Sequence, residues 1–426
     1  MTREIKLALH LDPATPTDLE SGEPPMMSYV KTAQKAEAAL FDAIFRADSY
    51  TFSPENLIDV KADLQIDPLI AFAGVTGFTQ RIGLVATAST TFNAPYQLSR
   101  QFLTLDMLSG GRVGWNAVTS FMGEEKFGLS SIPNQETRYE IATEFVEIVH
   151  RLWDSWPKDA FHKTEKGFFI DAKKISVVDF VGKHLKMKGA SDLPRSPQGR
   201  PVQFQAGASG QGKAFGARFA DVIFSASPDF HHATEIYQEF KNLARSFNRH
   251  PDHLLITPGF QPVLASTEQE ARDIFYSRTA NVNYTQALKK LEFLFGGVDY
   301  SDLSLDEPIP AHRLPDTSQL TRRQSRPELF KRLALEKNTV LRDVLYAVYH
   351  ETAHYTTFGS YDQITDELIH WFDNGAADGF VLVFKSQEDQ LDAFIEHVIP
   401  RLQDRGYFRK KYTATTLRGH LGLPEM

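Results

Sequence analysis

The chain has 426 residues, of which 42% are hydrophobic, carries a formal net charge of −8 and contains no cysteine. This length allows a sizeable buried core, and the lack of cysteine excludes disulfides, thiolate catalysis and cysteine-ligated zinc. The acidic balance, without a long basic run, argues against nucleic-acid binding. The N-terminus lacks a signal-peptide pattern and no segment approaches a membrane span, so we expect a cytoplasmic protein.

Eight short apolar runs along the chain predict β-strands, and helix-like segments follow most of them. The runs are Ile5–Leu11, Asp42–Ser49, Arg81–Ser89, Arg112–Val118, Pro201–Gly207, Asp221–Ser227, Leu254–Ala265 and Gly379–Phe384. Continuous apolar character is typical of parallel strands that are covered on both faces. Eight strands with intervening helices favour one α/β domain over residues 1–426, a (β/α)8 TIM barrel. A doubly wound open sheet has similar strands, and periodicity alone does not separate the two.

Two segments interrupt the strand and helix pattern, at about residues 157–200 and 284–337. Long connections without a regular pattern are usually functional lids or disordered linkers. Barrel enzymes keep their active sites at the end of the barrel where the strands finish, which we call the mouth. We expect both insertions to emerge there and cover a pocket; plain surface decoration is the alternative.

The stretch QAGASGQG, Gln205 to Gly212, directly follows a predicted strand and opens a helix. Small residues let backbone N–H groups approach a ligand, and a helix N-terminus favours an anion. Ser209 adds a hydroxyl donor. The stretch lacks the Lys-Ser/Thr pair of a Walker A loop and is no clean dinucleotide fingerprint. It therefore indicates a phosphate cradle, with an ordinary strand-to-helix turn as the alternative.

Polar residues end several of the predicted strands. Asp48 ends the second, Thr87 and Ser89 end the third, and Asn116 and Thr119 end the fourth. Residues from different strand ends converge at the mouth of a barrel, where catalytic residues are found. Each of them alone is also consistent with a helix cap in the following loop.

The segment HETAH, His350 to His354, matches the HExxH zinc pattern. Two histidines four residues apart on a helix can bind zinc, with Glu351 as the general base. The metzincin continuation is missing, because Tyr-Thr-Thr-Phe-Gly follows His354, and the surrounding plan is parallel α/β. We therefore expect no metal site and keep a zinc hydrolase only as an alternative. Without zinc, we expect His354 to face the pocket from a loop.

Read in order, these motifs resemble the FMNH2-dependent monooxygenases of the bacterial-luciferase family. The nearest branch contains nitrilotriacetate monooxygenase component A and dibenzothiophene-sulfone monooxygenase. The matching stretches span nearly the whole chain: Phe41–Ser49, Arg81–Ser120, Arg138–Trp156, Phe204–Gly212 and Gly375–Phe384. The block GGRVGWNAVTS within the second stretch is especially characteristic of the family.

The resemblance implies a barrel that holds FMN at its mouth. It assigns the phosphate to Ser209, Gly210 and Tyr139. Relatives often have His at the position of Gln135, which weakens that assignment. The implied cofactor-binding residues are Asp48, Thr87, Asn116, Gln135, Tyr139, Ser209 and Gly210, and the candidates for the pocket are His10, Asn116 and His354.

The resemblance also implies the reaction. Reduced flavin and O2 form a C4a-(hydro)peroxide, and the protein orients the substrate and excludes water. A separate NAD(P)H:flavin reductase supplies FMNH2, and a homodimer or homotetramer is the family habit. The alternatives are a deazaflavin-dependent oxidoreductase of the same superfamily and a flavin-binding protein without turnover.

The substrate stays open between organosulfur compounds and amine or chelate-type compounds, as used in xenobiotic degradation. A basic pocket favours a polycarboxylate, and His10, His312 and Arg313 are candidates for it. A hydrophobic pocket favours an aromatic sulfone or a thioether.

Overall fold

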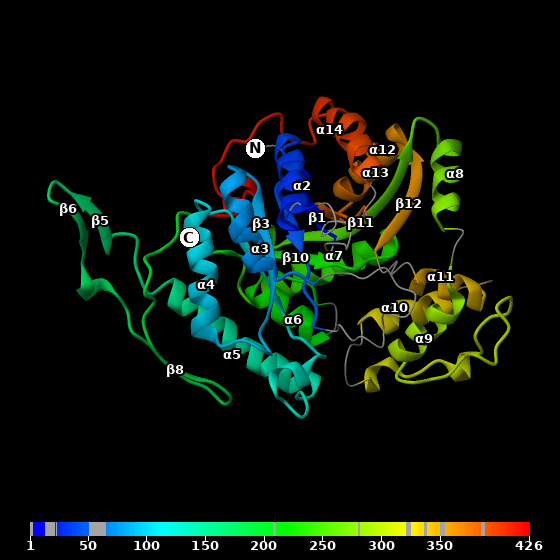
Figure 1. Cartoon of the computed structure of the whole chain (residues 1–426), viewed down its shortest axis with the longest axis horizontal. Helices are drawn as coiled ribbons and strands as arrows, with labels where there is room; N and C mark the ends of the chain where they lie inside the picture. Colours follow the sequence, from blue (N-terminus) through cyan, green and yellow to red (C-terminus); the bar gives the residue numbers. More distant parts are fainter. Residues whose placement is uncertain are drawn as a thin grey trace.

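Eight parallel strands close into a barrel at the centre of the molecule (Figure 1). Their order around the barrel is β1, β2, β3, β4, β9, β10, β11 and β13, and β13 pairs back to β1. The strands are β1 Lys6–His10, β2 Ala43–Arg46, β3 Gly83–Ser89, β4 Val113–Val118, β9 Val202–Gln205, β10 Val222–Ser225, β11 Leu255–Ala265 and β13 Gly379–Leu382. The computed structural model describes residues 3–12, 22, 24–50, 65–207, 210–279, 282–320, 325–335, 339–349, 354–384 and 388–426. All eight predicted strands and the TIM-barrel fold are confirmed.

Helices cover the outside of the barrel and bury one face of each strand. Several begin with an N-cap side chain: Asp67 accepts the Ile70 N–H at 2.9 Å and Pro68 follows it, while Asn134 caps α5 through the Thr137 N–H. The covering helices are α2 Met26–Ala38, α3 Pro68–Val75, α4 Pro95–Leu108, α5 Gln135–Trp153, α6 Gly210–Phe219, α7 Phe230–Ser246, α12 Tyr361–Asp373, α13 Glu388–Ala393 and α14 Ile399–Asp404. No helix among the described residues is both long and apolar enough to cross a membrane.

The inside of the barrel is filled by side chains that alternate with those facing the helices. Phe45, Val85, Phe204 and Phe224 belong to this inner cluster, together with three leucines near the C-terminus. One of these, Leu417, opens the short helix α15 (Leu417–His420) and lies close to Gly83, the first residue of β3. The C-terminal segment therefore closes the barrel at the end opposite the mouth.

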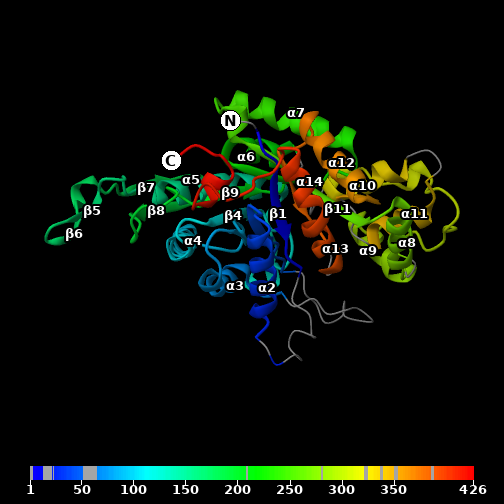
Figure 2. The ribbon, with the colours of Figure 1, turned by 90° about the horizontal axis from the view of Figure 1, so that it is seen from above.

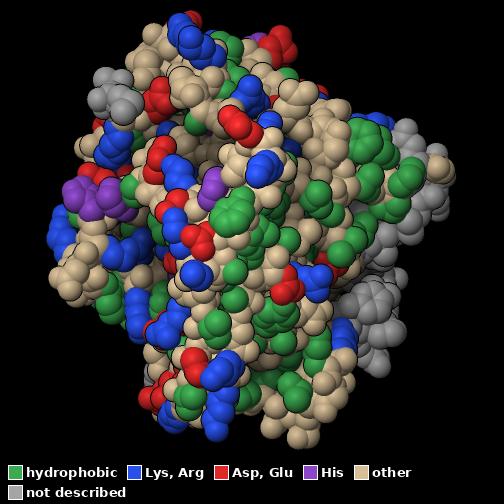
Figure 3. All heavy atoms as spheres, turned by 90° about the vertical axis from the view of Figure 1, so that its left-hand side faces the viewer, with side chains coloured by type: hydrophobic (Ala, Val, Ile, Leu, Met, Phe, Trp, Pro, Cys, Tyr) green, Lys and Arg blue, Asp and Glu red, His purple; other side chains and the backbone are tan. Residues whose placement is uncertain are grey.

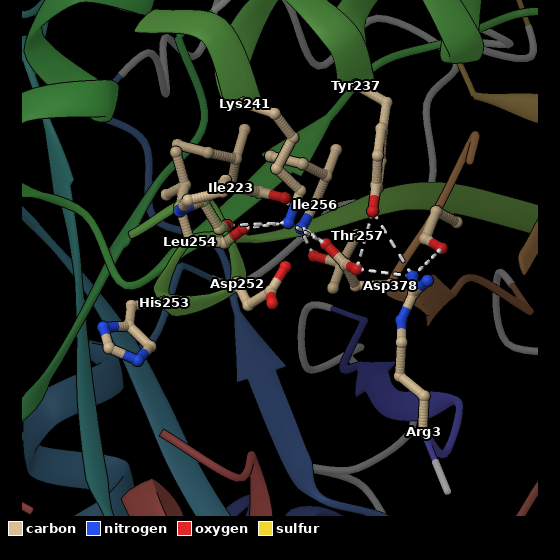
Figure 4. Close-up of polar contacts among 12 residues, drawn as sticks. Arg3, Ile223, Tyr237, Lys241, Asp252, His253, Leu254, Ile256, Thr257 and Asp378 are labelled. Atoms are coloured by element: carbon tan, nitrogen blue, oxygen red, sulfur yellow. Dashed lines mark hydrogen bonds and ion pairs between the residues drawn. The ribbon is translucent and has the colours of Figure 1, made fainter. Parts of the chain in front are cut away.

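Buried ion pairs hold this closed end together. Asp378, just before β13, lies 2.8 Å from the Lys241 ammonium and 2.6 Å from the Arg3 guanidinium, and accepts the Tyr237 hydroxyl (Figure 4). Two further buried pairs join strand starts to the C-terminal segment, namely Asp42 with Arg409 and Asp221 with Arg418. Each carboxylate also accepts a backbone N–H at the start of a neighbouring strand.

A ninth strand, β12 (Tyr355–Ser360), lies outside the barrel and was not predicted. It pairs in parallel with Phe260–Ala265, the second half of β11, after the first half has paired with β10 and β13. The eleven-residue β11 therefore leaves the barrel halfway along its length. The chain reaches β12 from α8 (Glu268–Thr279) through the second insertion.

The first insertion, residues 157–200, forms two antiparallel hairpins at the side of the barrel. They are β5 Phe161–Thr164 with β6 Gly167–Ile170, and β7 Val178–Val181 with β8 Lys186–Gly189. It follows α5, which runs from the mouth to the closed end, and its last residues bind there through Gln198 and the Val113 carbonyl. The expectation that this insertion covers the mouth is therefore wrong, because the chain enters and leaves it at the opposite end.

The second insertion is helical, contrary to the expectation of an irregular segment. The helices α9 Tyr284–Leu294 and α10 Ser325–Ala334 pack with α11 Leu341–Tyr349 around their own small core. Arg332 of α10 lies 3.9 Å from Glu235 in the first turns of α7, which begin at the mouth. The two insertions lie on opposite sides of the barrel (Figure 1 and Figure 2), and whether the second covers the mouth stays a prediction.

Candidate functional site

Two inward-facing polar side chains meet at the mouth, on adjacent strands. Thr87 of β3 and Asn116 of β4 are register partners, and the Asn116 Nδ2 donates to the Thr87 Oγ1 at 2.9 Å. The alternate residues Trp115 and Ala117 pack in the outer core, so Asn116 points into the barrel. Asn116 is 3% exposed and its Oδ1 has no hydrogen-bond partner. A buried acceptor without a donor costs free energy unless a ligand or water satisfies it.

The turn between β9 and α6 is the place of the predicted phosphate cradle, and the structure describes Gly207 and Gly210 on either side of it. A Cβ at Gly207 would lie 2.9 Å from the Tyr139 hydroxyl and would overlap the Gln205 amide, so a larger residue there would displace these two polar groups. Gly210 opens the ten-residue helix α6 and has open space around its Cα. The Tyr139 ring also packs against Phe215 of α6, with ring centroids 5.8 Å apart. Ala208 and Ser209 lie outside the described residues, so the predicted phosphate role of Ser209 stays a prediction.

Asp48 and Gln135 lie at the same end of the barrel. Asp48 follows β2, and its carboxylate accepts the Ser49 N–H at 2.9 Å. Burial raises the pKa of Asp48, and the Ser49 N–H opposes this rise. Gln135 is the first residue of α5, one turn before Tyr139 on the same helix. The predicted residues of the second strand, the fourth strand and α5 thus lie at the same end of the barrel.

A row of rings crosses the inside of the barrel just below the mouth. The ring centroids of His10 and Phe45 are 6.0 Å apart, and those of Phe45 and Phe224 are 5.1 Å apart. Phe224 in turn stacks on His354, with ring centroids 5.1 Å apart. His354 reaches this row from the residue before β12, and a Cβ at Gly259 of β11 would overlap its imidazole. Both histidines proposed for the pocket therefore belong to one row, and the missing side chain at Gly259 makes room for the second.

Three loops at the mouth carry an aromatic cluster that was not predicted. Phe92 stacks on Phe127 with centroids 4.2 Å apart and planes 3° from parallel, and Tyr50 meets both edge-on. Gly123 has a φ of +89° and lies against the Tyr50 backbone, which positions the third loop. The only signal in the sequence was an aromatic residue soon after the second, third and fourth strands.

Some candidates from the sequence are not brought to this site. Arg313 pairs with Asp302 at 2.7 Å within the second insertion, and His312 beside it is exposed. Neither provides the basic pocket that was considered for a polycarboxylate. For the zinc alternative, His350 and Glu351 lie outside the described residues, and His354 packs in the ring row. The described residues contain no cluster of three metal-ligating side chains.

The polar groups at the mouth fit an FMN molecule. A phosphate suits the N-terminus of α6 beside the Tyr139 hydroxyl, because exposed backbone N–H groups there attract an anion. A planar ring with polar edges suits the open Asn116 Oδ1, with the ring row providing an apolar surface. These two groups lie on neighbouring parts of the barrel, since Asn116 is the register partner of Phe204 and Gln205 follows it into the turn.

Comparison with known proteins shows a single family over most of the chain. The family model for luciferase-like monooxygenases matches residues 7–398. The chain is 36% identical to N-acetyl-S-(2-succino)cysteine monooxygenase of Bacillus subtilis, 33% to nitrilotriacetate monooxygenase component A of Aminobacter aminovorans and 34% to dibenzothiophene-sulfone monooxygenase of Rhodococcus erythropolis. Each match covers 93% of this chain and 89% of the relative.

A solved structure gives the same result. The riboflavin lyase determined with modified FMN and riboflavin superimposes with a TM-score of 0.84 at 26% identity, covering 99% of this chain and 96% of that chain. The resemblance found in the sequence, including both branch members named for it, is confirmed. The three relatives compared by sequence are named as monooxygenases and do not favour the deazaflavin or zinc alternatives.

Proposed function

Because the chain belongs to the luciferase-like monooxygenase family, we propose that it is an FMN-dependent monooxygenase that uses O2 and reduced flavin. It transfers one oxygen atom to a small organic compound, and the other atom leaves as water. The observation that supports this proposal best is the pairing of an open, buried acceptor at Asn116 with a glycine cradle under the Tyr139 hydroxyl. One site accepts a flavin ring and the other accepts its phosphate.

The side chains of this chain bind and orient the cofactor and exclude water from it. Tyr139 and the N-terminus of α6, with Gly210 and Ser209, hold the phosphate, while Thr87 fixes the Asn116 amide so that its oxygen faces the ring. Asp48 and Gln135 line the same end. When bound, reduced FMN supplies the electrons that activate O2, which protein side chains do not provide themselves.

The ring row orients the substrate on the open side of the flavin. His10 and His354 add two polar edges to an otherwise apolar surface, and the cluster of Tyr50, Phe92 and Phe127 extends it. An apolar surface protects reactive oxygen species from water and from side reactions. It accepts an organosulfur or amine-type compound of modest size, in line with the names of the relatives.

We also propose that a separate NAD(P)H:flavin reductase delivers the reduced flavin, since one relative is named as component A of its enzyme. The protein then takes up flavin by diffusion and works as a homo-oligomer in the cytoplasm.

The test compares binding of FMN and riboflavin, which differ only in the phosphate. Tyr139→Phe removes the hydroxyl beside Gly207, so FMN affinity falls about tenfold, the effect of one charge-assisted hydrogen bond, while riboflavin affinity stays. Tyr407→Phe is the matched control, because that hydroxyl binds Asp373 on the outside of the barrel.

Turnover is tested with candidate thioethers, sulfones and chelates in the presence of a flavin reductase, NADH and 18O2. One labelled oxygen atom in the product supports the proposal. If the purified protein neither binds FMN in either redox state nor labels any candidate, the proposal is wrong.

A further inference from the structure

The helix α5 carries Tyr139 in its first half, where few apolar side chains are buried. The structure describes every residue of this helix, and the only buried apolar side chain in residues 135–144 is that of Ala142. In residues 145–153, by contrast, six apolar side chains are buried. Packing of apolar side chains is what mainly holds a helix on its neighbours. The first half of α5 therefore depends on other contacts to keep its place.

The second hairpin of the first insertion lies along the outside of α5 (Figure 1 and Figure 2). Phe180 of β7 packs in one buried cluster with Ile148 and Leu152, which belong to the second half of the helix. The turn between β7 and β8 spans residues 182–185. Apolar contacts thus fix the hairpin on the well-packed half of α5 and leave its turn to contact the other half.

The turn binds the carboxylate of Glu144 through its backbone. Three consecutive N–H groups, those of Lys183, His184 and Leu185, donate to this carboxylate at 2.7, 3.0 and 2.7 Å. A Cβ at Gly182 would overlap the same carboxylate, so the glycine leaves room for it. Desolvation raises the pKa of Glu144, but the three N–H groups outweigh this effect and hold the pKa below its ordinary value. Hydrogen bonds to an ionised group are the strong ones, so this contact fixes the turn on the helix.

The side chains of the same turn pair with Glu140, the residue after Tyr139. The Lys183 Nζ and the His184 Nε2 lie 2.8 Å and 2.7 Å from the Glu140 carboxylate. Basic and acidic side chains lie next to one another over this side of the molecule (Figure 3), and an exposed ion pair by itself adds little to stability. The pairs at Glu140 matter because of their place: together with Glu144 they attach the turn to the part of α5 that carries Tyr139.

We propose that residues 182–185 form a brace that keeps the first half of α5 in place, with Glu140 and Glu144 as positioning residues for the flavin phosphate. They act through Tyr139, whose hydroxyl lies beside Gly207. This role rests on the FMN site proposed above, and it links the first insertion to cofactor binding although the insertion does not cover the mouth. Loss of the brace lets Tyr139 move away from the phosphate, which weakens binding of FMN but not of riboflavin.

The test measures FMN and riboflavin affinities of the full-length protein by fluorescence titration. Glu144→Ala removes the acceptor of the three N–H groups and should weaken FMN binding by at least about threefold and at most about tenfold, the limit set by loss of the Tyr139 hydroxyl itself. Riboflavin affinity should stay within about twofold of wild type. Glu144→Gln keeps an acceptor oxygen, so its FMN affinity should lie between those of wild type and Glu144→Ala.

Asp179→Ala is the matched control, because it also removes one carboxylate. The ion pair of Asp179 with Lys188, at 2.8 Å, is exposed and joins the two strands of the same hairpin. This variant should bind both flavins like wild type. Circular dichroism and the melting temperature check that each variant is folded.

A double-mutant cycle with Tyr139→Phe separates positioning from a general effect on the fold. In the Tyr139→Phe background, Glu144→Ala should not lower FMN affinity further, because the hydroxyl through which it acts is absent. The brace is overturned if Glu144→Ala keeps the wild-type preference for FMN, or if it costs the same FMN affinity with and without the hydroxyl. A wild type that binds FMN and riboflavin equally would overturn the proposed phosphate site as well, so the two failures are distinguishable.

Discussion

The two ends of the barrel satisfy their buried polar groups in opposite ways. At the closed end, Asp42, Asp221 and Asp378 each contact a buried cation and accept a backbone N–H. At the mouth, the inward polar groups are mostly neutral, and the amide oxygen of Asn116 has no partner. Closed networks stabilise a fold, whereas open acceptors are satisfied by a ligand. The ion pairs that stabilise the barrel thus lie at the closed end, and the candidate binding groups lie at the mouth, as is general in barrel enzymes.

The largest effect is expected from Asp378→Asn at the closed end. The substitution removes the carboxylate and leaves the Lys241 ammonium buried without its anion, so the free energy of unfolding should fall by about 3–5 kcal/mol. Urea denaturation measures this loss, and FMN binding by the folded protein should not change. Asp362→Asn is the control, because its ion pair with Arg401 is exposed and should contribute less than about 1 kcal/mol. Equal losses in the two variants would contradict the comparison.

Asp106 is the exception at the closed end and gives a pH-dependent prediction. Its Oδ1 accepts the Val113 N–H at 2.9 Å and the Gln198 amide at 2.7 Å, and burial raises its pKa to about 6. The folded-state pKa lies above the ordinary aspartate pKa of 3.8. The contribution of Asp106 to stability is therefore complete below pH 3.8 and is lost as the pH rises through about 6.

Asp106→Asn keeps both accepted hydrogen bonds and cannot ionise. Relative to wild type it should therefore gain up to about 3 kcal/mol of unfolding free energy as the pH rises from about 4 to about 6, with little further change above that. Urea denaturation at several pH values measures the difference between the two proteins. If the unfolding free energies of wild type and Asp106→Asn differ by the same amount at every pH, ionisation of Asp106 does not destabilise the fold. Asp362→Asn, at an exposed carboxylate, is the control.

An intermediate effect is expected where His354 meets β11. Gly259→Ala places a Cβ in the space of the imidazole, so the imidazole must move, at a cost of about 1–3 kcal/mol of unfolding free energy. In the His354→Ala background the same substitution should cost less than about 1 kcal/mol, because the space is empty. Thermal unfolding of wild type, Gly259→Ala, His354→Ala and the double variant provides the four stabilities of this double-mutant cycle. Equal costs in both backgrounds would place His354 away from Gly259.

The smallest change in stability is expected at Asn116. Asn116→Ala loses one hydrogen bond, to Thr87, worth about 1 kcal/mol, but it should weaken binding of FMN and riboflavin equally, by about tenfold. This pattern differs from that of Tyr139→Phe, which affects FMN alone. Fluorescence titration with both flavins measures it, and Asn242→Ala, an exposed asparagine on α7, is the control. A variant that binds both flavins like wild type would remove Asn116 from the site.

The strands of the barrel could be predicted because each is a local run of apolar residues with a clear boundary. β12 was missed because Thr356 and Thr357 make it half polar, and it is only half buried. The hairpins of the first insertion were missed for a related reason: each strand has four residues, and those of the β5–β6 pair are all exposed. A strand that is buried on both faces is a continuous apolar run in the sequence, whereas an exposed strand has no such run.

The candidate site was predictable in part. Asp48, Thr87, Asn116 and Tyr139 were predicted to lie at one end of the barrel from their positions near the ends of predicted strands. Parallel strands all finish at the mouth. The space that Gly259 leaves for His354, 95 residues later, depends on how β11 leaves the barrel and could not be read from either residue. The same holds for Asp42 and Arg409, whose sequence separation of 367 residues hides the pair.

By itself, the sequence determined the family, the eight strands and the strand ends that form the site. Each of these is encoded by neighbouring residues, through apolar runs, helix caps and a glycine-rich turn. Only the tertiary structure decided that the first insertion is attached at the closed end of the barrel, that His354 enters the ring row, and that Asp42, Asp221 and Asp378 are paired with buried cations at the closed end. These features depend on closure of the barrel, which sets distances between residues far apart in the chain, and local physical chemistry does not fix such distances.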